Sequence, residues 1–429
     1  METLKDKTIC IIGLGYVGLP LACQVAAKGY NVYGFDVNKE IVDKTNAGIC
    51  HMKDDELQIK LSQAKGKLTA TTDASILKQC NIIIVCVPTP VYHNFSPNLE
   101  YIRSSAEAIA KHIKKGDLIV IESTIYPGTI EEIVLPILEK SGLNVGTDFH
   151  LAHCPERIDP GNKRWTIANL PRVVGGTTQE ATDAAHAFYS SIIDASITKL
   201  SCVKVAEATK IVENTFRDIN IAFVNELAKS FDHLNIDVVE VIKGAATKPF
   251  AFLPHFPGAG VGGHCISIDP YYLIERAKEN GFTHNFLVLA REINNSMPHY
   301  TIQRTIVGLN QIHKSVKGTK ITVLGVSYKP NVDDHRESPS FKVIEELKKL
   351  GANLQIYDPY LPKFSTVRTL QEALQAECLV LVTAHKEFLQ IDLERAKSAG
   401  VKLIIDGRNC LDKNKIKSLG IVYKGIGRN

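Results

Sequence analysis

Residues 8–18 read Thr-Ile-Cys-Ile-Ile-Gly-Leu-Gly-Tyr-Val-Gly, so that a short apolar run ends directly in a Gly-x-Gly-x-x-Gly motif. A helical pattern follows at 19–28, and a second apolar run at 31–35 ends at Asp36. Strand, glycine motif, helix, strand and acidic residue in this order form the fingerprint of a dinucleotide-binding fold. A glycine motif alone can be a chance turn, but both strands and the acid in register favour a nucleotide site.

The three glycines of this motif have different expected roles. Gly13 permits the tight turn, Gly15 lets a pyrophosphate approach the backbone, and Gly18 lets the helix pack on the strand. The start of the helix then offers unpaired N–H groups and the positive end of its dipole to the phosphates. Asp36 is suited to bind a ribose diol and to repel a 2′-phosphate, which favours NAD over NADP. The predicted cofactor contacts here are Gly13, Gly15, Tyr16, Val17, Gly18 and Asp36.

Two further strands are expected at 82–87 and 118–121, and each ends in polar loop residues. A doubly wound parallel sheet places its ligand contacts in such loops. Ordinary loop capping is the alternative role for Thr89 and Thr124. The predicted cofactor contacts in these loops are Pro88, Thr89, Ser123 and Thr124.

The composition of the 429 residues indicates a folded protein of about three domains. A net charge of +4, evenly spread, argues against nucleic acid or a membrane surface as the main partner. No apolar run approaches the ~20 residues that span a bilayer, and 1–7 lacks the apolar core of a signal peptide, so we expect a soluble, cytoplasmic protein. Several of the ten cysteines lie in apolar runs and are expected to be small buried hydrophobes of a reducing compartment: Cys10, Cys80 and Cys86.

The middle and the end of the chain predict two more parts. A long helical pattern at 203–234, apolar on more than one side, is followed by helical stretches at 270–280 and 286–297. Strands expected at 320–325, 353–357, 379–383 and 403–406 then repeat the strand pattern of the N-terminal part, with Asp358 after the second strand. The glycine fingerprint is absent there, and the polar loop 326–338 stands in its place, which indicates a different nucleotide.

These patterns predict an α/β protein with two Rossmann-like, doubly wound parallel-sheet domains joined by a helical dimerisation domain. The expected ranges are 1–200 for the NAD-binding domain, 201–314 for the helical domain and 315–429 for the second nucleotide domain. Because a helical insert between sheet domains often supplies a dimer interface, we expect a homodimer or a larger homo-oligomer.

Residues 256–265 read Phe-Pro-Gly-Ala-Gly-Val-Gly-Gly-His-Cys. Four glycines suit backbone that wraps closely around a ligand and presents Cys265 at the mouth of the next helix, where a thiol is a good nucleophile. Three alternatives stay open: a small buried cysteine, a phosphate loop that would lack its Gly-Lys-Ser/Thr ending, and a zinc site. The zinc ligands would be His153-Cys154 and His264-Cys265, which lack the usual spacing.

Seven motifs in this order resemble the UDP-glucose/GDP-mannose dehydrogenase family over nearly the whole chain. They are 13–18, 86–90, 122–124, 155–157, 207–214, 262–265 and 329–338. The resemblance implies an NAD-binding domain, a helical dimerisation domain and a domain that binds the nucleotide sugar. It also implies oxidation of a sugar C6 alcohol to a carboxylate with two NAD⁺.

The resemblance further implies roles for individual residues. Cys265 matches the nucleophile, and Lys210 matches a lysine that stabilises developing oxyanions, with Asn214 one turn along the same helix. Glu156 and Thr124 match a pair that positions water and carries protons, and Asp269 matches an acid that assists activation. The implied substrate contacts are Glu156, Arg157, Lys210, Asn214, Lys248, Gly262, Lys329, Arg336 and Arg408.

Simpler roles are possible for three of these residues: Lys210 on a solvated helix face, Asp269 as a helix cap, and Arg336 as a surface charge. Two stretches, 155–162 and 247–250, are most similar to the UDP-N-acetylhexosamine branch, and within it to UDP-N-acetylglucosamine 6-dehydrogenases. The chain departs from UDP-glucose dehydrogenases at Ile268, where they carry lysine, and at His264, where they carry serine.

Lys248 stands where other members bring an arginine across the dimer. Other sugars remain alternatives, namely UDP-N-acetylmannosamine, UDP-N-acetylgalactosamine and UDP-glucose. A two-electron dehydrogenase of the hydroxyacid type and a non-catalytic NAD-binding protein are the alternatives from other classes.

Overall fold

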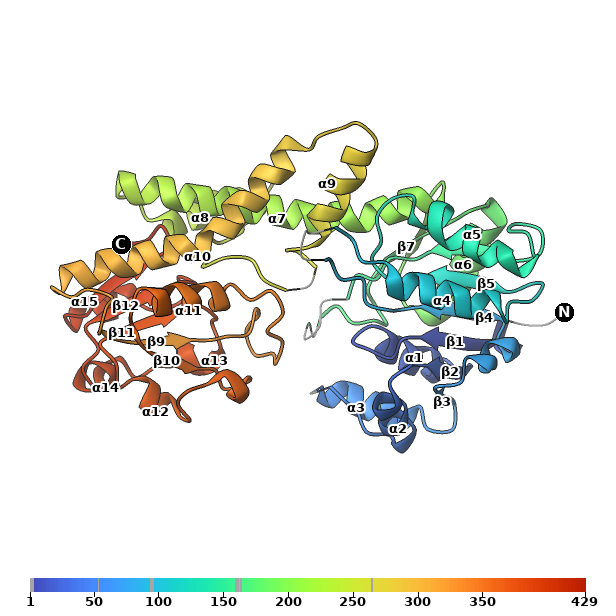
Figure 1. Ribbon diagram of the computed structural model, residues 1–429, viewed down its shortest axis with the longest axis horizontal. Coiled ribbons are helices and arrows are strands. Elements are labelled where there is room, and N and C mark those ends of the chain that lie inside the picture. The colour runs from blue at the N-terminus through green and yellow to red at the C-terminus, as the bar shows by residue number, and fades with distance from the viewer. Residues whose placement is uncertain (1–3, 53, 93–95, 159–161, 163, 264) are drawn as a thin grey trace. The chain divides into compact units, whose positions relative to one another are not determined.

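The computed structural model describes residues 4–52, 54–92, 96–158, 162, 164–263 and 265–429 (Figure 1). The chain forms two compact units, one of Met1–Glu213 with Tyr271–Asn280 and the other of Asn214–Pro270 with Gly281–Asn429. His264 and residues 159–161, which entered the zinc alternative and the family resemblance, lie outside the described residues.

The first unit is built on a sheet in which eight strands are described, in the order β3-β2-β1-β4-β5-β6-β7-β8. All neighbours pair in parallel except β6 and β7. The strands are β1 Thr8–Ile12, β2 Asn31–Phe35, β3 Leu68–Thr71, β4 Ile82–Val85, β5 Leu118–Ile121, β6 His150–His153, β7 Arg172–Gly176 and β8 Ile197–Lys199.

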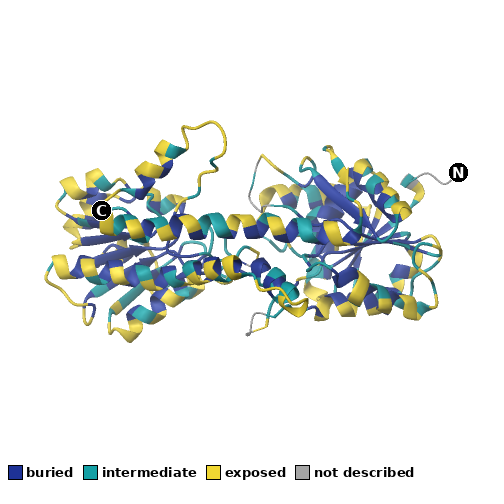
Figure 2. Cartoon of the chain, turned by 90° about the horizontal axis from the view of Figure 1, so that it is seen from above, coloured by how far each residue is buried: buried dark blue, intermediate teal, exposed yellow. Residues whose placement is uncertain are grey.

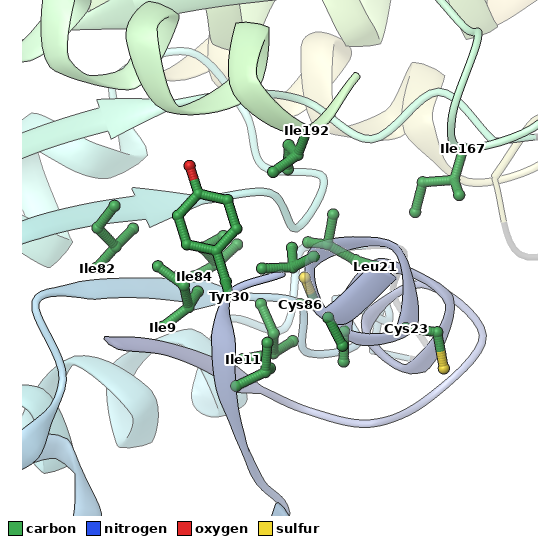
Figure 3. Close-up of a cluster of buried hydrophobic side chains, with 14 of the residues drawn as sticks. Ile9, Ile11, Leu21, Cys23, Tyr30, Ile82, Ile84, Cys86, Ile167 and Ile192 are labelled. Atoms are coloured by element: carbon green, nitrogen blue, oxygen red, sulfur yellow. The ribbon is translucent and has the colours of Figure 1, made fainter. Parts of the chain in front are cut away.

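Helices cover both faces of this sheet. The helices are α1 Gly18–Ala27, α2 Lys39–Ala47, α3 Asp55–Gln63, α4 Glu100–Ala110, α5 Leu135–Leu138 and α6 Gln179–Ile192. In β1, Ile9 and Ile11 pack toward α1 and α6, whereas Cys10 and Ile12 pack toward α4. Figure 3 shows the first of these two cores, with strand side chains meeting those of α1 and the end of α6. A strand that is apolar on both sides needs cover on both faces, which parallel sheets with crossover helices provide.

The second unit holds a parallel sheet in which the described strands have the order β10-β9-β11-β12-β13. In β11, Cys378 and Val380 face one core, and Leu379 and Leu381 face the other. Figure 2 shows these strands buried and the outer sides of the surrounding helices exposed. The strands are β9 Lys320–Leu324, β10 Asn353–Tyr357, β11 Cys378–Leu381, β12 Leu403–Asp406 and β13 Val422–Gly425, and the helices are α11 Ser340–Lys349, α12 Leu370–Ala373, α13 Lys386–Leu389, α14 Leu393–Ser398 and α15 Lys413–Ser418.

The structure describes four helices in the middle of the chain: α7 Val203–Leu234, α8 Val238–Ala245, α9 Asp269–Glu279 and α10 Asn285–Gln311. The prediction that the last of them ends at 297 is wrong, because α10 continues through Pro298 for more than three further turns. A proline inside a helix costs about 3 kcal/mol or more. Ile302 and Leu309, which lie beyond it, are buried in one core of the second sheet and offset this cost.

The α/β class with two parallel-dominated sheets and a helical middle region is confirmed. The division into domains at residues 200 and 314 stays a prediction. Cys10, Cys80 and Cys86 are buried, as expected. Within the described part of the chain, no helix combines the length and the apolar character needed to cross a bilayer.

Candidate active site

The turn between β1 and α1 is packed so tightly that it requires glycine at two positions. Gly13 has a φ of 88°, and a Cβ added there would lie 2.8 Å from the carbonyl oxygen of Cys86. At Gly18 an added Cβ would lie 1.8 Å from the carbonyl oxygen of Gly13. At Gly15 it would meet no atom within 4 Å. Gly13 and Gly18 therefore serve packing, and Gly15 leaves open space beside the start of α1, as a pyrophosphate requires.

Asp36 is held in place while keeping part of its hydrogen-bonding capacity. Its Oδ2 accepts a hydrogen bond from the Leu14 N–H at 2.8 Å, and its Oδ1 accepts one from the Asn38 N–H at 2.8 Å. A carboxylate has about four acceptor positions, so the half-buried Asp36 can still accept two hydroxyl donors. These residues fit the adenosine ribose and the phosphates of NAD.

The loops after β4 and β5 are fastened to one another. Ser123 Oγ donates to the Val87 carbonyl oxygen at 2.8 Å, and Tyr272 Oη on α9 donates to the Thr89 carbonyl oxygen at 2.5 Å. Ser123 and Thr89 are buried, and their observed contacts hold loop backbone in position. Of the other predicted contacts, Tyr16 and Pro88 are exposed, and Val17 and Thr124 are half-buried.

Behind these loops lies a buried ionic cluster that the sequence did not predict. Arg172, at the start of β7, has only 1% of its side chain exposed. Its Nη1 lies 3.1 Å from Oε2 of Glu122, and its Nη2 lies 3.1 Å from Oε2 of Glu156. Tyr189 Oη on α6 donates to Glu122 Oε1 at 2.5 Å. Burial raises the pKa of Glu122 to about 7, although the positive charge of Arg172 opposes this shift.

Glu156 is held from two sides. Besides its contact with Arg172, its Oε1 accepts hydrogen bonds from the Arg157 N–H at 2.6 Å and from the Ile158 N–H. The Arg157 guanidinium is engaged elsewhere, because it pairs with Glu213 on α7 and donates to the Pro171 carbonyl oxygen at 3.0 Å. The contacts of Arg157 therefore fasten this loop to α7.

Lys210 on α7 is only 9% exposed, so the alternative of a solvated helix face is wrong. Glu207, about one turn earlier, is fully buried and accepts hydrogen bonds from the Gly128 N–H at 2.6 Å and the Ile130 N–H at 2.8 Å. Burial raises the pKa of Glu207 to about 7. These bonds tie the turn of α7 that carries Lys210 to the loop that follows β5.

In the second unit, Cys265 lies in a turn four residues before the first residue of α9 and is exposed, so the alternative of a small buried cysteine is wrong. The Cys265 carbonyl oxygen accepts a hydrogen bond from the Asp269 N–H at 2.8 Å. The carboxylate of Asp269, buried at 3% exposure, accepts one from Asn214 Nδ2 on α7 at 2.5 Å. Three of the predicted catalytic residues are thus brought together, and Asp269 does more than begin a helix.

The glycines before Cys265 have a packing cause that the sequence did not reveal. Gly263 has a φ of 89°, a region that favours glycine. Its N–H donates to the Arg336 carbonyl oxygen at 3.1 Å, which joins this loop to the loop after β9. A Cβ added at each glycine would lie close to a neighbouring segment of the second unit: 2.8 Å from Arg408 for Gly258, 2.8 Å from Pro339 for Gly260, 2.7 Å from Glu337 for Gly262 and 2.6 Å from Tyr328 for Gly263.

Asp358 follows β10 as Asp36 follows β2, but its carboxylate has no hydrogen-bonding capacity left for a ligand. Its Oδ2 accepts hydrogen bonds from the Val326 and Ser327 N–H groups and lies 3.1 Å from Nε2 of the buried His385. Its Oδ1 accepts two more backbone N–H groups. Burial raises the pKa of Asp358, but these bonds outweigh it and hold the pKa well below the ordinary value. Asp358 fixes the loop after β9 and cannot bind a ribose as Asp36 can.

Four of the basic residues predicted to contact the substrate lie in the second unit, namely Lys248, Lys329, Arg336 and Arg408. Arg336 is exposed and pairs with Asp334 at 2.6 Å, as the surface-charge alternative supposes. The half-buried Arg408 donates from Nε to the Val382 carbonyl oxygen at 2.7 Å. Lys329 is half-buried, and the exposed Lys248 lies 4.8 Å over the Phe250 ring.

His153 has a structural role. Its Nδ1 lies 2.7 Å from the Ile121 carbonyl oxygen, and burial lowers its pKa to about 3. Over the described ranges, three or more His, Cys, Asp or Glu side chains do not gather in a way that could hold a metal ion.

Three family models match the chain in succession. They are the NAD-binding, central and UDP-binding domains of the UDP-glucose/GDP-mannose dehydrogenase family, at residues 7–193, 204–296 and 322–413. The chain belongs to this family. It is an NAD-dependent oxidoreductase whose first domain binds the cofactor and whose last is the family's UDP-binding domain.

Individual relatives are similar over nearly their full length. A UDP-N-acetyl-D-mannosamine dehydrogenase of Pyrococcus horikoshii is 37% identical, over 98% of this chain and 99% of the relative. A UDP-N-acetyl-D-glucosamine 6-dehydrogenase of Pseudomonas aeruginosa is 35% identical, over 96% and 99%. The solved structure of a UDP-D-ManNAc dehydrogenase from Pyrococcus horikoshii superimposes with a TM-score of 0.93 at 36% identity, over 98% of this chain and 99% of that one.

Proposed function

We propose that this enzyme oxidises the C6 alcohol of a UDP-N-acetylhexosamine to the uronic acid, using two NAD⁺ and one water, with UDP-N-acetylglucosamine as the preferred sugar. The observation that carries the proposal is the exposed Cys265, in a turn that is fastened to Asp269 and to the second nucleotide-binding domain. A two-electron oxidation needs no nucleophile, whereas oxidation to the acid needs a group that holds the aldehyde.

The reaction balances in four steps. The alcohol carbon loses a hydride and its oxygen a proton, and the Cys265 thiolate adds to the resulting aldehyde to give a thiohemiacetal. Loss of a second hydride leaves a thioester, which water hydrolyses to the carboxylate and the free thiol. Each hydride is accepted by one bound NAD⁺.

The remaining residues have supporting roles in this scheme. Lys210 and Asn214 stabilise negative charge on the C6 oxygen, and such donors typically contribute ~3–4 kcal/mol each. Glu156 moves protons through Thr124 or a water. Asp269 accepts one N–H of the Asn214 amide in the hydrogen bond at 2.5 Å. This bond orients the amide, whose second N–H serves the C6 oxygen. The residues that contact the nucleotide sugar in this scheme are Arg157, Lys248, Gly262, Lys329, Arg336 and Arg408.

We also propose that the enzyme works as a homodimer or a larger homo-oligomer. Support comes from α7, on which Phe216 and Phe223 are 49% and 53% exposed. Large aromatic side chains on one helix are typical of an interface. Light scattering of the purified chain measures the state directly.

The substrate is tested by incubating the enzyme with NAD⁺ and a panel of nucleotide sugars. The panel contains UDP-linked N-acetylglucosamine, N-acetylmannosamine, N-acetylgalactosamine and glucose, with product masses read by mass spectrometry. We expect the uronic acid of N-acetylglucosamine to form with the highest kcat/KM. A higher value for another sugar would correct the sugar alone, whereas an aldehyde as final product, or no product, would refute the proposed reaction.

A further inference from the structure

The buried Arg172 has no place in the reaction above, yet it contacts one of the proposed participants. Arg172 lies between two carboxylates of the first unit, Glu122 after β5 and Glu156 after β6, at 3.1 Å from each. A guanidinium is planar and stays charged, so it holds carboxylates in fixed directions. Burying a charged triad is not by itself favourable to stability, which makes a functional reason worth testing.

We propose that Arg172 is the positioning residue for Glu156: its guanidinium fixes the orientation of the Glu156 carboxylate, which accepts a proton in the reaction. This inference rests on the proposed role of Glu156 in proton transfer. Arg172 itself contacts neither the reacting carbon nor its oxygen in this scheme.

The hydrogen bonds of the two carboxylates support this role. Glu122 is fully buried, and its pKa is raised to about 7, chiefly by that burial. Glu156 accepts two backbone N–H bonds at Oε1 and the bond from Arg172 at Oε2. Donors on both oxygens hold the Glu156 carboxylate in one direction, and the one on Oε2 is Arg172.

The other titratable groups around the cluster do not compete with Arg172 for Glu156. The titratable groups that face it are Cys86 after β4, Glu122 after β5, Cys154 after β6, Arg172 on β7 and Tyr189 on α6. Burial raises the pKa values of the two thiols and of Tyr189, so these three groups are neutral at pH 7. Arg172 is thus the positive charge among these neighbours of Glu156.

The test compares one double variant of the complete enzyme with two single-substitution controls. Arg172→Met alone leaves Glu122 buried without a cation and can fail to fold, so Arg172→Met is combined with Glu122→Gln. Glu122→Gln alone is the matched control, because it keeps the contact between Arg172 and Glu156. Lys199→Met, which removes an exposed cation paired with Asp183 in the same unit, controls for the loss of a positive charge.

The decisive readout is the split between kcat and KM for UDP-N-acetylglucosamine at saturating NAD⁺. We expect kcat of the double variant to fall at least about tenfold while KM stays within about twofold of the wild-type value, because the Glu156 carboxylate keeps its place in the loop but loses its fixed direction for proton transfer. In Glu122→Gln and Lys199→Met, kcat should stay within about twofold of the wild-type value. A wild-type kcat in the double variant would overturn the assignment of Arg172.

The Glu156→Gln background separates this inference from the proposed function. If Arg172 acts through Glu156, adding Arg172→Met and Glu122→Gln to Glu156→Gln should lower kcat no further, and a further tenfold loss would overturn the inference. A wild-type kcat in Glu156→Gln alone would instead refute the role of Glu156 in the reaction.

Discussion

Gly18 and Gly15, in the turn between β1 and α1, should respond differently to the same substitution, because packing requires the first glycine and the cofactor requires the second. In Gly18→Ala the new Cβ would lie 1.8 Å from the Gly13 carbonyl oxygen, which is backbone and cannot rotate away. Relieving the overlap requires β1 and α1 to separate by roughly 1 Å, and strain of this kind destabilises by about 3 kcal/mol. In Gly15→Ala the new Cβ meets nothing within 4 Å.

We therefore expect opposite behaviour of the two variants in two assays. Urea unfolding is followed through the fluorescence of Trp165, which lies in the first unit and is the single tryptophan of the sequence. Gly18→Ala should unfold at clearly lower urea, whereas Gly15→Ala should match or exceed wild type by about 0.4–1 kcal/mol, because alanine restricts the unfolded chain.

Binding of NAD⁺ by calorimetry gives the complementary result. Gly15→Ala should weaken it at least about tenfold, or 1.4 kcal/mol, because its methyl group occupies the space left for the pyrophosphate. Wild-type affinity in a folded Gly15→Ala would refute the placement of the phosphates. Wild-type stability in Gly18→Ala would refute the packing argument.

Two further predictions concern Glu207 and Tyr328. The pKa of Glu207 is about 7 in the folded state against 4.5 in the unfolded state, so the free energy of unfolding should fall by about 3 kcal/mol as the pH rises from 4.5 to 7. Glu207→Gln cannot ionise, so urea unfolding at pH 5 and 7.5 should show a smaller loss of stability in this variant, and a loss equal to that of the wild type would contradict the prediction. Tyr328→Ala removes the ring that packs on Gly263, so kcat should drop about tenfold, whereas Tyr328→Phe keeps the ring and should have the kcat of the wild type. Equal kcat values for the two variants would argue against a role for the contact between the Tyr328 ring and Gly263.

The sequence predicted the fold well where the signal is local. The predicted strands 8–12, 31–35, 118–121, 353–357 and 403–406 and the helix 203–234 have the observed bounds. Buried parallel strands are short apolar runs that end in glycine or polar residues, so their limits are legible. The end of α10 was missed because Pro298 is a helix breaker by local rules, and the burial that outweighs it comes from a sheet that lies later in the chain.

The site was predictable only in part, for the same reason. Residue types mark Asp36, Cys265 and Lys210, because motifs place them at fixed spacings. The contacts of Arg172 with Glu122 and Glu156 span three strand ends, and no short pattern contains them. The packing cause of the four glycines is hidden as well, since their neighbours lie some 65 to 150 residues further along the chain.

The central claim, that Cys265 carries the oxidation past the aldehyde, is tested most directly by counting NADH per molecule of UDP-N-acetylglucosamine consumed. The wild-type enzyme should form two, and Cys265→Ser, with unchanged NAD⁺ affinity, should form at most one and stop at the aldehyde. Two NADH per sugar from the serine variant, or one from the wild type, would contradict the account.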